Sequence, residues 1–168
     1  HGRRLEPLLK FRGLSTMELA GQVAMWINRV KPDITFIDET GLGAGVVDRL
    51  MELGFNVVGI NFGASPSPQS KDLYYNKRAE MWVEMRDWVI AGCQMPNDNE
   101  LRQDLVGPEV GFDAKMRLQL ETKESMKKRG LASPDCGDAV ALTFAMPAPA
   151  IWNEKWGGPT EPELAPDY

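Results

Sequence analysis

The order of hydrophobic and polar positions predicts an α/β chain in which helices alternate with short strands. Residues 15–30 carry leucine, valine and isoleucine three or four positions apart, the spacing of a helix with one apolar face. Ser15 and Glu18 have the spacing of a capping box at its start. Apolar runs at 34–37 and 56–62 predict buried strands. The helical stretch 46–53 between them implies a parallel pair with a right-handed crossover.

The rest of the pattern predicts further elements on both sides of this unit. We expect an edge strand at 4–11, interrupted by Pro7, a long helix at 74–90, and a loop with a short helix at 94–110. A strand at 116–120 and a basic helical connector at 122–129 should follow. The last helix should have Ser133 as its N-cap and Pro134 at its first position. It continues over 138–145 with apolar residues on every face, which predicts burial.

Composition limits the chemistry that the chain can perform. The 168 residues, 43% hydrophobic and 26% charged, fit one globular domain with a sizeable core. Two isolated cysteines do not make a disulfide framework or a zinc site, and the single histidine is residue 1. We therefore expect plain thiols in a reducing compartment. No apolar run is long enough to span a membrane. Any catalysis must rest on carboxylates.

The formal net charge of −5 is unevenly distributed. From residue 147 onward four acidic residues accompany one lysine, a net charge of −3, which leaves −2 for the rest of the chain. We therefore expect a domain at 1–146 and a proline-rich acidic tail without regular structure at 147–168. Basic residues cluster at 77–78 and 127–129. Such local clusters, rather than the total charge, decide phosphate binding.

Acidic residues lie where predicted strands end and helices begin. Asp38 and Glu39 follow the first buried strand, and ligands of open α/β sheets bind at the carboxyl ends of strands. Asp38 could cap the following turn or bind a cation, and Glu39 could assist it. Asp138 lies where the final helix enters the core, so we favour metal ligation for it. For Asp135, beside the expected N-cap, we favour capping.

The glycine-rich turn at 41–45 offers a different hypothesis, a nucleotide-binding α/β domain. Its spacing is GxGxG rather than the GxGxxG of dinucleotide sites, and no ribose-binding acid follows the next strand at the expected distance. The phosphate-binding motif GxxxxGK[ST] does not occur. The turn is therefore only a weak indication of a nucleotide.

Three stretches, in consistent order, resemble the nuclease domain of phage terminase large subunits. Residues 37–43 (IDETGLG) resemble the second acidic motif of that family, 76–82 (NKRAEMW) its following helix, and 127–143 its last acidic motif. The likeness spans residues 4–145. It implies a ribonuclease H-like mixed sheet with flanking helices. It also implies an endodeoxyribonuclease that cuts concatemeric viral DNA during genome packaging.

Carried over by position, this resemblance makes Asp38 and Asp138 catalytic, metal-binding carboxylates, with Asp135 as an accessory ligand or cap. The cofactors would be two Mg²⁺ or Mn²⁺ ions. The substrate would be double-stranded DNA. The DNA backbone would contact five basic residues: Lys77, Arg78, Lys127, Lys128 and Arg129. A solvated helix face explains the same residues equally well. The parent protein of a phage or prophage would work in the bacterial cytoplasm with an ATPase motor domain, a small terminase subunit and a portal, and without a membrane.

The chain also departs from the family. The family's first carboxylate and first strands have no counterpart here, nor does its ATPase motor domain. We therefore expect an N-terminally incomplete domain with an open edge beside the strand at 34–37, and feeble nuclease activity. The alternative from another class is a non-catalytic docking module of a phage packaging machine. Metal titration distinguishes the two hypotheses.

Overall fold

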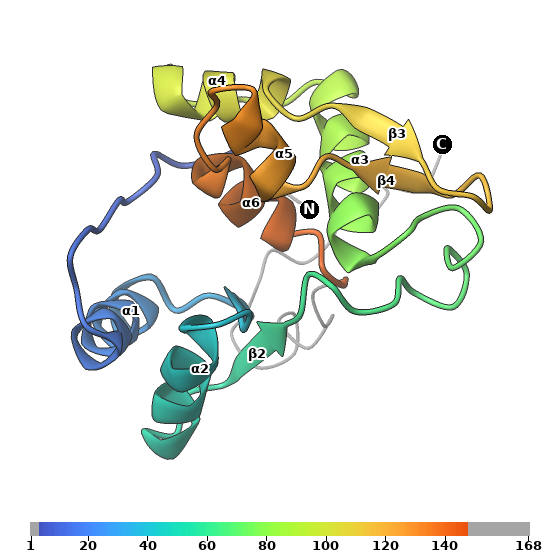
Figure 1. Ribbon diagram of the computed structural model, residues 1–168. Coiled ribbons are helices and arrows are strands. Elements are labelled where there is room, and N and C mark those ends of the chain that lie inside the picture. Colours follow the sequence, from blue (N-terminus) through green and yellow to red (C-terminus); the bar gives the residue numbers. More distant parts are fainter. Residues whose placement is uncertain (1–3, 148–168) are drawn as a thin grey trace, which may run out of the picture.

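The computed structural model, which describes residues 4–147, is a mixed α/β structure (Figure 1). The elements follow the order α1 (Thr16–Val30), β1 (Thr35–Asp38), α2 (Gly43–Glu52), β2 (Val57–Ile60), α3 (Lys77–Ile90), α4 (Asn99–Val106), β3 (Val110–Phe112), β4 (Leu118–Leu120), α5 (Lys123–Lys128) and α6 (Asp135–Leu142). The predicted tail lies, from residue 148 on, outside the described residues. Within 4–147, no helix combines the length and apolarity needed to cross a membrane.

The parallel pair β1–β2, predicted from the strand–helix–strand pattern, separates two hydrophobic cores. Asp38 pairs with Ile60 at the end of the ladder. Ile37 and Val57 belong to a core with α1 and α2, whereas Phe36 and Ile60 belong to a larger core with α3 and α6 (Figure 1). Side chains alternate between the faces of a strand. Asp38 therefore shares the face of Phe36, on the side of α6.

The segment 4–11, predicted as an edge strand, contains no strand. Arg4 alone forms an isolated bridge there, with Gln94. Pro7 cannot donate a ladder hydrogen bond, and Leu8 packs against the larger core instead. Lys10 then ties the segment to two carboxylates at the start of α4. The prediction was wrong because, beyond one backbone hydrogen bond from Leu5 to Gln94, this segment is held by side-chain contacts and not by a neighbouring strand.

Several boundaries also differ from the sequence pattern. α3 begins at Lys77 rather than at 74, because Asn76 is its N-cap. The side chain of Asn76 accepts a hydrogen bond from the N–H of Ala79. β4 was predicted, but its antiparallel partner β3 was not. All three residues of β3 are exposed, so their side chains carry no burial pattern that could have marked a strand.

The glycine-rich turn is mostly part of α2. Gly41 has a φ of +68°, a conformation that favours glycine, and the helix begins two residues later at Gly43. A Cβ at Gly43 would overlap the carbonyl oxygen of Asp38. The glycines therefore allow α2 to start directly against the end of β1, which gives them a packing role.

The predicted burial of the last helix is confirmed, but its start differs. Pro134 occupies the N-cap and contributes no side-chain hydrogen bond, so Ser133 is not the cap. The cap comes from α4, where Asp104 Oδ2 accepts the N–H groups of Cys136 at 2.8 Å and Gly137 at 3.2 Å. Burial raises the pKa of Asp104 although these hydrogen bonds oppose the shift.

An apolar groove of about 1000 Å³ runs beside β1. Residues of α1 and α6, residues 32–36 and the segment 4–11 line it. β1 pairs with β2 along one edge, and no strand among residues 4–147 pairs with its other edge. The described part of the chain thus has the open edge expected from the sequence.

Candidate functional site

Asp138, in the first turn of α6, is buried and bound by two side chains of α3. Arg78 Nε and Trp82 Nε1 each donate a 2.8 Å hydrogen bond to Asp138 Oδ1. The side chain of Asp138 is only 7% exposed and that of Arg78 only 9%. A buried carboxylate is costly unless it is paired and hydrogen-bonded. Arg78 and Trp82 meet this need and fix the orientation of Asp138.

The other carboxylate oxygen of Asp138 faces Lys123, the first residue of α5. Lys123 Nζ lies 3.0 Å from Asp138 Oδ2, as an ion pair without hydrogen-bond geometry. Among the described residues, neither Asp138 Oδ2 nor Arg78 Nη2 has a hydrogen-bond partner, although both atoms are buried. Buried polar atoms normally have partners. This side of Asp138 can therefore accept a further polar or cationic group.

Asp135 lies near the same lysine. Its Oδ1 is 3.8 Å from Lys123 Nζ, and its side chain is 80% exposed. It makes no capping hydrogen bond, because Asp104 holds the first N–H groups of α6. Asp135 therefore does not cap α6 by a hydrogen bond, but it lies in the first turn, where an acidic side chain interacts favourably with the helix dipole. Its carboxylate remains available to a ligand from solvent.

Asp38 does not join this cluster through any direct bond. Its Oδ1 accepts the N–H of Thr40 at 2.9 Å, which closes the turn after β1. Glu39 lies on the other face, where its side chain fills the place of a Cβ at Gly59. Within residues 4–147, no hydrogen bond or ion pair connects Asp38 with Asp138. The described residues also contain no group of three or more histidine, cysteine or acidic side chains arranged to hold a metal.

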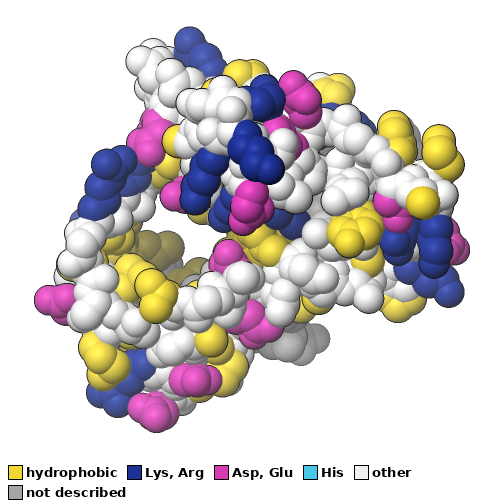
Figure 2. All heavy atoms as spheres, viewed as in Figure 1, with side chains coloured by type: hydrophobic (Ala, Val, Ile, Leu, Met, Phe, Trp, Pro, Cys, Tyr) yellow, Lys and Arg dark blue, Asp and Glu magenta, His cyan; other side chains and the backbone are white. Residues whose placement is uncertain are grey.

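The basic residues predicted to contact DNA differ in their availability. Arg78 is buried, Lys77 is 16% exposed and paired with a glutamate of its own helix, and Arg129 binds two glutamates. Lys127 and Lys128 are exposed, and neither forms an ion pair with a residue of the described part of the chain. Figure 2 shows basic and acidic side chains above a hollow, over the part of the molecule that holds α4 to α6. Two of the five candidate cations are thus free to meet a phosphate.

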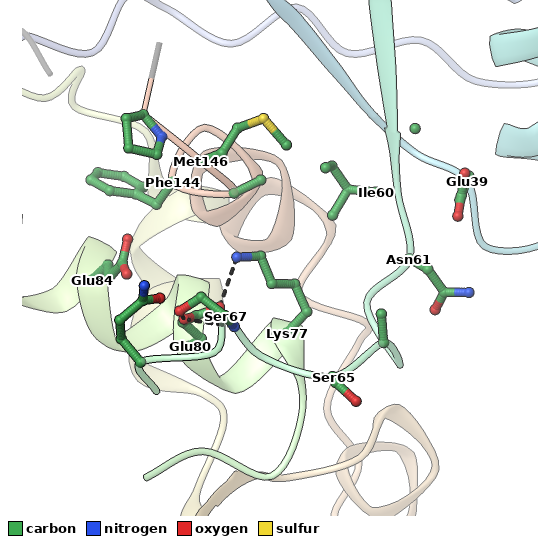
Figure 3. Close-up of a pocket in the computed structure, with 15 residues that line it drawn as sticks. Glu39, Ile60, Asn61, Ser65, Ser67, Lys77, Glu80, Glu84, Phe144 and Met146 are labelled. Carbon is green, nitrogen blue, oxygen red and sulfur yellow. Dashed lines mark hydrogen bonds and ion pairs between the residues drawn. The ribbon is translucent and has the colours of Figure 1, made fainter. Parts of the chain in front are cut away.

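A second cavity, of about 780 Å³, lies at the carboxyl ends of β1 and β2 and contains several polar side chains (Figure 3). Glu80 of α3 is buried there, and accepts hydrogen bonds from the backbone N–H and hydroxyl of Ser67 and from Lys77 Nζ at 2.7 Å. Burial alone would raise the pKa of Glu80, but the hydrogen bonds from Lys77 and Ser67 lower it. Glu39 and Asn61 lie at the other end of this cavity. Glu80 fixes the loop after β2 to α3.

Sequence reasoning did not identify three residues that organise these sites: Trp82, Glu80 and Asp104. The sequence pattern places Trp82 in the apolar stripe of its helix. Nothing in that pattern indicates that its indole N–H donates a hydrogen bond to a buried carboxylate. Glu80 and Asp104 are residue types that usually lie on the surface, but here they are only 1% and 9% exposed. Glu80 has a local partner in Lys77, but the backbone groups that the two carboxylates bind, those of Ser67 and Cys136, are 13 and 32 residues away in the chain. No local spacing could have indicated those contacts.

Three-dimensional comparison finds the same architecture in solved nuclease domains. No family model matches the chain, and no curated protein matches its sequence. A variant of the nuclease domain of the large terminase subunit gp2 of bacterial virus Sf6, solved with manganese and β-thujaplicinol, has a TM-score of 0.76 and 19% identity, covering 88% of this chain and 80% of that one. The nuclease domain of the same subunit without the substitution has a TM-score of 0.67 and 19% identity, covering 77% of this chain and 72% of that one. A variant of that subunit solved with calcium has a TM-score of 0.66 and 19% identity, covering 76% of this chain and 71% of that one.

These likenesses define the fold of the chain. It is a ribonuclease H-like α/β fold with helices on both faces of a small parallel sheet. More narrowly, it is the fold of a terminase large-subunit nuclease domain, which confirms at the level of structure the resemblance found in the sequence motifs.

Proposed function

We propose that this chain is the metal-dependent endonuclease domain of a phage terminase large subunit, which cleaves concatemeric viral DNA during genome packaging. The domain would comprise residues 1–146, with an acidic tail at 147–168. Its substrate would be double-stranded DNA. The parent protein would act in the bacterial cytoplasm with an ATPase motor domain, a small terminase subunit and a portal.

The observation that carries this proposal is the pair Asp135 and Asp138 at the start of α6, both of which lie within 4 Å of the ammonium group of Lys123. The fold around them is that of nuclease domains solved with manganese or calcium, which supports a role for divalent cations. In such a site, carboxylates can bind cations that activate water and stabilise the leaving oxygen of a phosphodiester.

The donor atoms suit a hard divalent cation such as Mg²⁺ or Mn²⁺, which prefers oxygen ligands. Asp138 Oδ2 lacks a hydrogen-bond partner among the described residues, and Asp135 is open to solvent. Arg78 and Trp82 hold the opposite oxygen of Asp138, and so would orient Oδ2 toward a ligand. Asp38, on the face of β1 that α6 covers, would provide the third carboxylate.

The test is cleavage of supercoiled plasmid by the purified chain in millimolar Mn²⁺ over long incubations. We expect slow nicking that EDTA abolishes and that Asp135→Asn and Asp138→Asn each remove. Asp135 is exposed, so its variant should fold normally. Asp87→Asn, at an exposed acid of α3, should nick as fast as the parent. Nicking that persists in both site variants would contradict the proposal.

A non-catalytic docking module is the second candidate, and the apolar groove beside the open edge of β1 favours it. An unpaired strand edge is a template for pairing with another chain. Calorimetric titration with Mn²⁺ separates the two candidates. A docking module should show no cation binding that depends on Asp135, whereas a nuclease should lose that binding in Asp135→Asn.

A further inference from the structure

We propose that the cavity at the carboxyl ends of β1 and β2 binds a linear aliphatic diamine or polyamine, with ammonium groups at Glu39 and at Glu84. The residues that line this cavity include none of Asp38, Asp135 and Asp138. The inference therefore does not depend on the proposed nuclease function, and the two can fail separately.

The two ends of the cavity carry carboxylates without a counter-ion. Glu39 follows β1 and Glu84 belongs to α3, and Figure 3 shows them at opposite ends of the cavity. Neither side chain forms a hydrogen bond or an ion pair with any of residues 4–147. Each carboxylate is thus available to a cationic group that enters from solvent.

Between these ends, the charges of the cavity compensate one another. Lys77 Nζ donates a 2.7 Å hydrogen bond to Glu80, and the two side chains are 16% and 1% exposed. This pair is therefore a fixed part of the wall. The charged residues that line the cavity are three glutamates and one lysine, which leaves a net charge of −2 on Glu39 and Glu84. A dication neutralises both carboxylates, whereas a monocation leaves one of them unpaired.

The wall of the cavity includes apolar side chains that can cover a methylene chain. Ile60, Phe144 and Met146 line it, and they lie above Lys77 in Figure 3. The volume of about 780 Å³ is within the range of small-molecule sites, and the carboxyl ends of parallel strands are a common place for them. Methylene groups gain free energy when they leave water for such a wall. The lining thus matches a ligand with charged ends and an apolar middle.

Rigid elements hold the two carboxylates. The backbone N–H of Glu39 donates a 3.1 Å hydrogen bond to the carbonyl of Ile60. A Cβ at Gly59 would overlap Glu39 Oε2, so the glycine lets this carboxylate lie against β2. Glu84 lies one turn after Glu80 on α3, which Ser67 ties to the loop after β2. A fixed separation between two charges predicts a preferred length of the ligand.

The test is isothermal titration calorimetry of the purified chain without DNA or metal, with putrescine, cadaverine and spermidine as probes and butylamine as the monoamine control. We expect one ligand per chain and affinities that depend on the length of the amine. Butylamine should bind at least about fivefold more weakly than putrescine, the equivalent of one partly exposed ion pair. Glu39→Gln and Glu84→Gln should each weaken the tightest probe by a similar factor.

Glu124→Gln, at an exposed acid of α5, is the matched control for the loss of a negative charge. It should bind the amines like the parent chain. Thermal melting shows whether the variants fold, and spermidine should raise the melting temperature of the parent more than that of Glu84→Gln.

Three results would overturn the inference: no saturable binding of any probe, equal affinity for butylamine and putrescine, or an equal loss of affinity in Glu124→Gln. Each of them leaves the nuclease proposal intact, because plasmid nicking is tested at Asp135 and Asp138. Conversely, amine binding that survives in Asp135→Asn while nicking is absent from every chain would retain the cavity and reject the nuclease.

Discussion

Arg78 and Asp138, which are 60 residues apart in the sequence, form a buried ion pair at 2.8 Å that joins α3 to α6. Both residues lie in sequence motifs that resemble those of terminase nuclease domains. From the sequence, Arg78 fits either a DNA contact or a solvated helix face, but its side chain is directed into the protein, toward the carboxylate. The pair links the fold to the candidate site, because the hydrogen bond that stabilises α6 also orients Asp138.

Replacing Arg78 should therefore damage the fold. We expect Arg78→Met to lower the free energy of unfolding by about 3 to 5 kcal/mol, because the charge of Asp138 would lose its closest compensation. The double variant Arg78→Met with Asp138→Asn should recover part of this loss, since no buried carboxylate remains. Urea denaturation measures both effects.

Arg86→Ala is the matched control for this prediction. Arg86 lies on the same helix, is 58% exposed and pairs only with its neighbour Asp87 among the described residues. We expect it to change stability by less than about 0.5 kcal/mol. A similarly small effect of Arg78→Met would show that Asp138 does not depend on its arginine.

The cap that Asp104 provides for α6 makes a prediction about pH. At neutral pH, Asp104→Ala should destabilise the chain by about 1 to 2 kcal/mol, because two N–H groups lose their acceptor. Asp104→Asn retains an acceptor oxygen and removes a buried charge. It should be near neutral or stabilising.

The sign of the pH effect follows from the raised pKa of Asp104. Above the usual aspartate pKa, the folded protein binds the proton more strongly than the unfolded chain, so this residue's contribution to stability falls as pH rises through the folded pKa. Asp104→Asn lacks this dependence. The difference in unfolding free energy between parent and variant should therefore narrow as pH falls from about 7 to 4. A difference that widens would contradict the assignment.

The close approach of α2 to β1 can be tested with a single methyl group. Gly43→Ala should cost about 1 to 3 kcal/mol, because the new Cβ would overlap the backbone oxygen of Asp38 and force α2 away from the strand end. Gly21→Ala, in the interior of α1, has no atom near its Cβ. It should stabilise the chain by about 0.5 to 1 kcal/mol through helix propensity. Circular dichroism melts of both variants compare the two signs.

DNA affinity should depend on Lys127 and Lys128 rather than on all five predicted cations. If each contacts a phosphate, Lys127→Ala and Lys128→Ala should each reduce the slope of log affinity against log salt by about 1. Lys115→Ala, at the exposed turn between β3 and β4, should leave the slope unchanged. Fluorescence anisotropy with a labelled duplex at several salt concentrations gives these slopes. Equal losses at Lys115 would indicate non-specific attraction.

The sequence alone determined the features that depend on local periodicity. The spacing of apolar residues gave the α/β class, the parallel pairing of β1 with β2 and the burial of α6, because a strand or helix that buries one face must repeat apolar residues at its own period. The motifs around Asp38 and Asp138 also led to the fold. The same logic failed for residues 4–11, because a strand needs a partner edge as well as an apolar pattern.

Only the tertiary structure decided which groups meet. The contact of Arg78 with Asp138, the cap of α6 by Asp104 and the ion pairs of Lys123 with Asp135 and Asp138 all join separate elements. None of them follows from residue spacing, because such contacts are set by how the helices pack against one another. Packing also decided the surroundings of two residues that spacing had left open. It left Asp135 without a capping hydrogen bond and buried Arg78 beside Asp138.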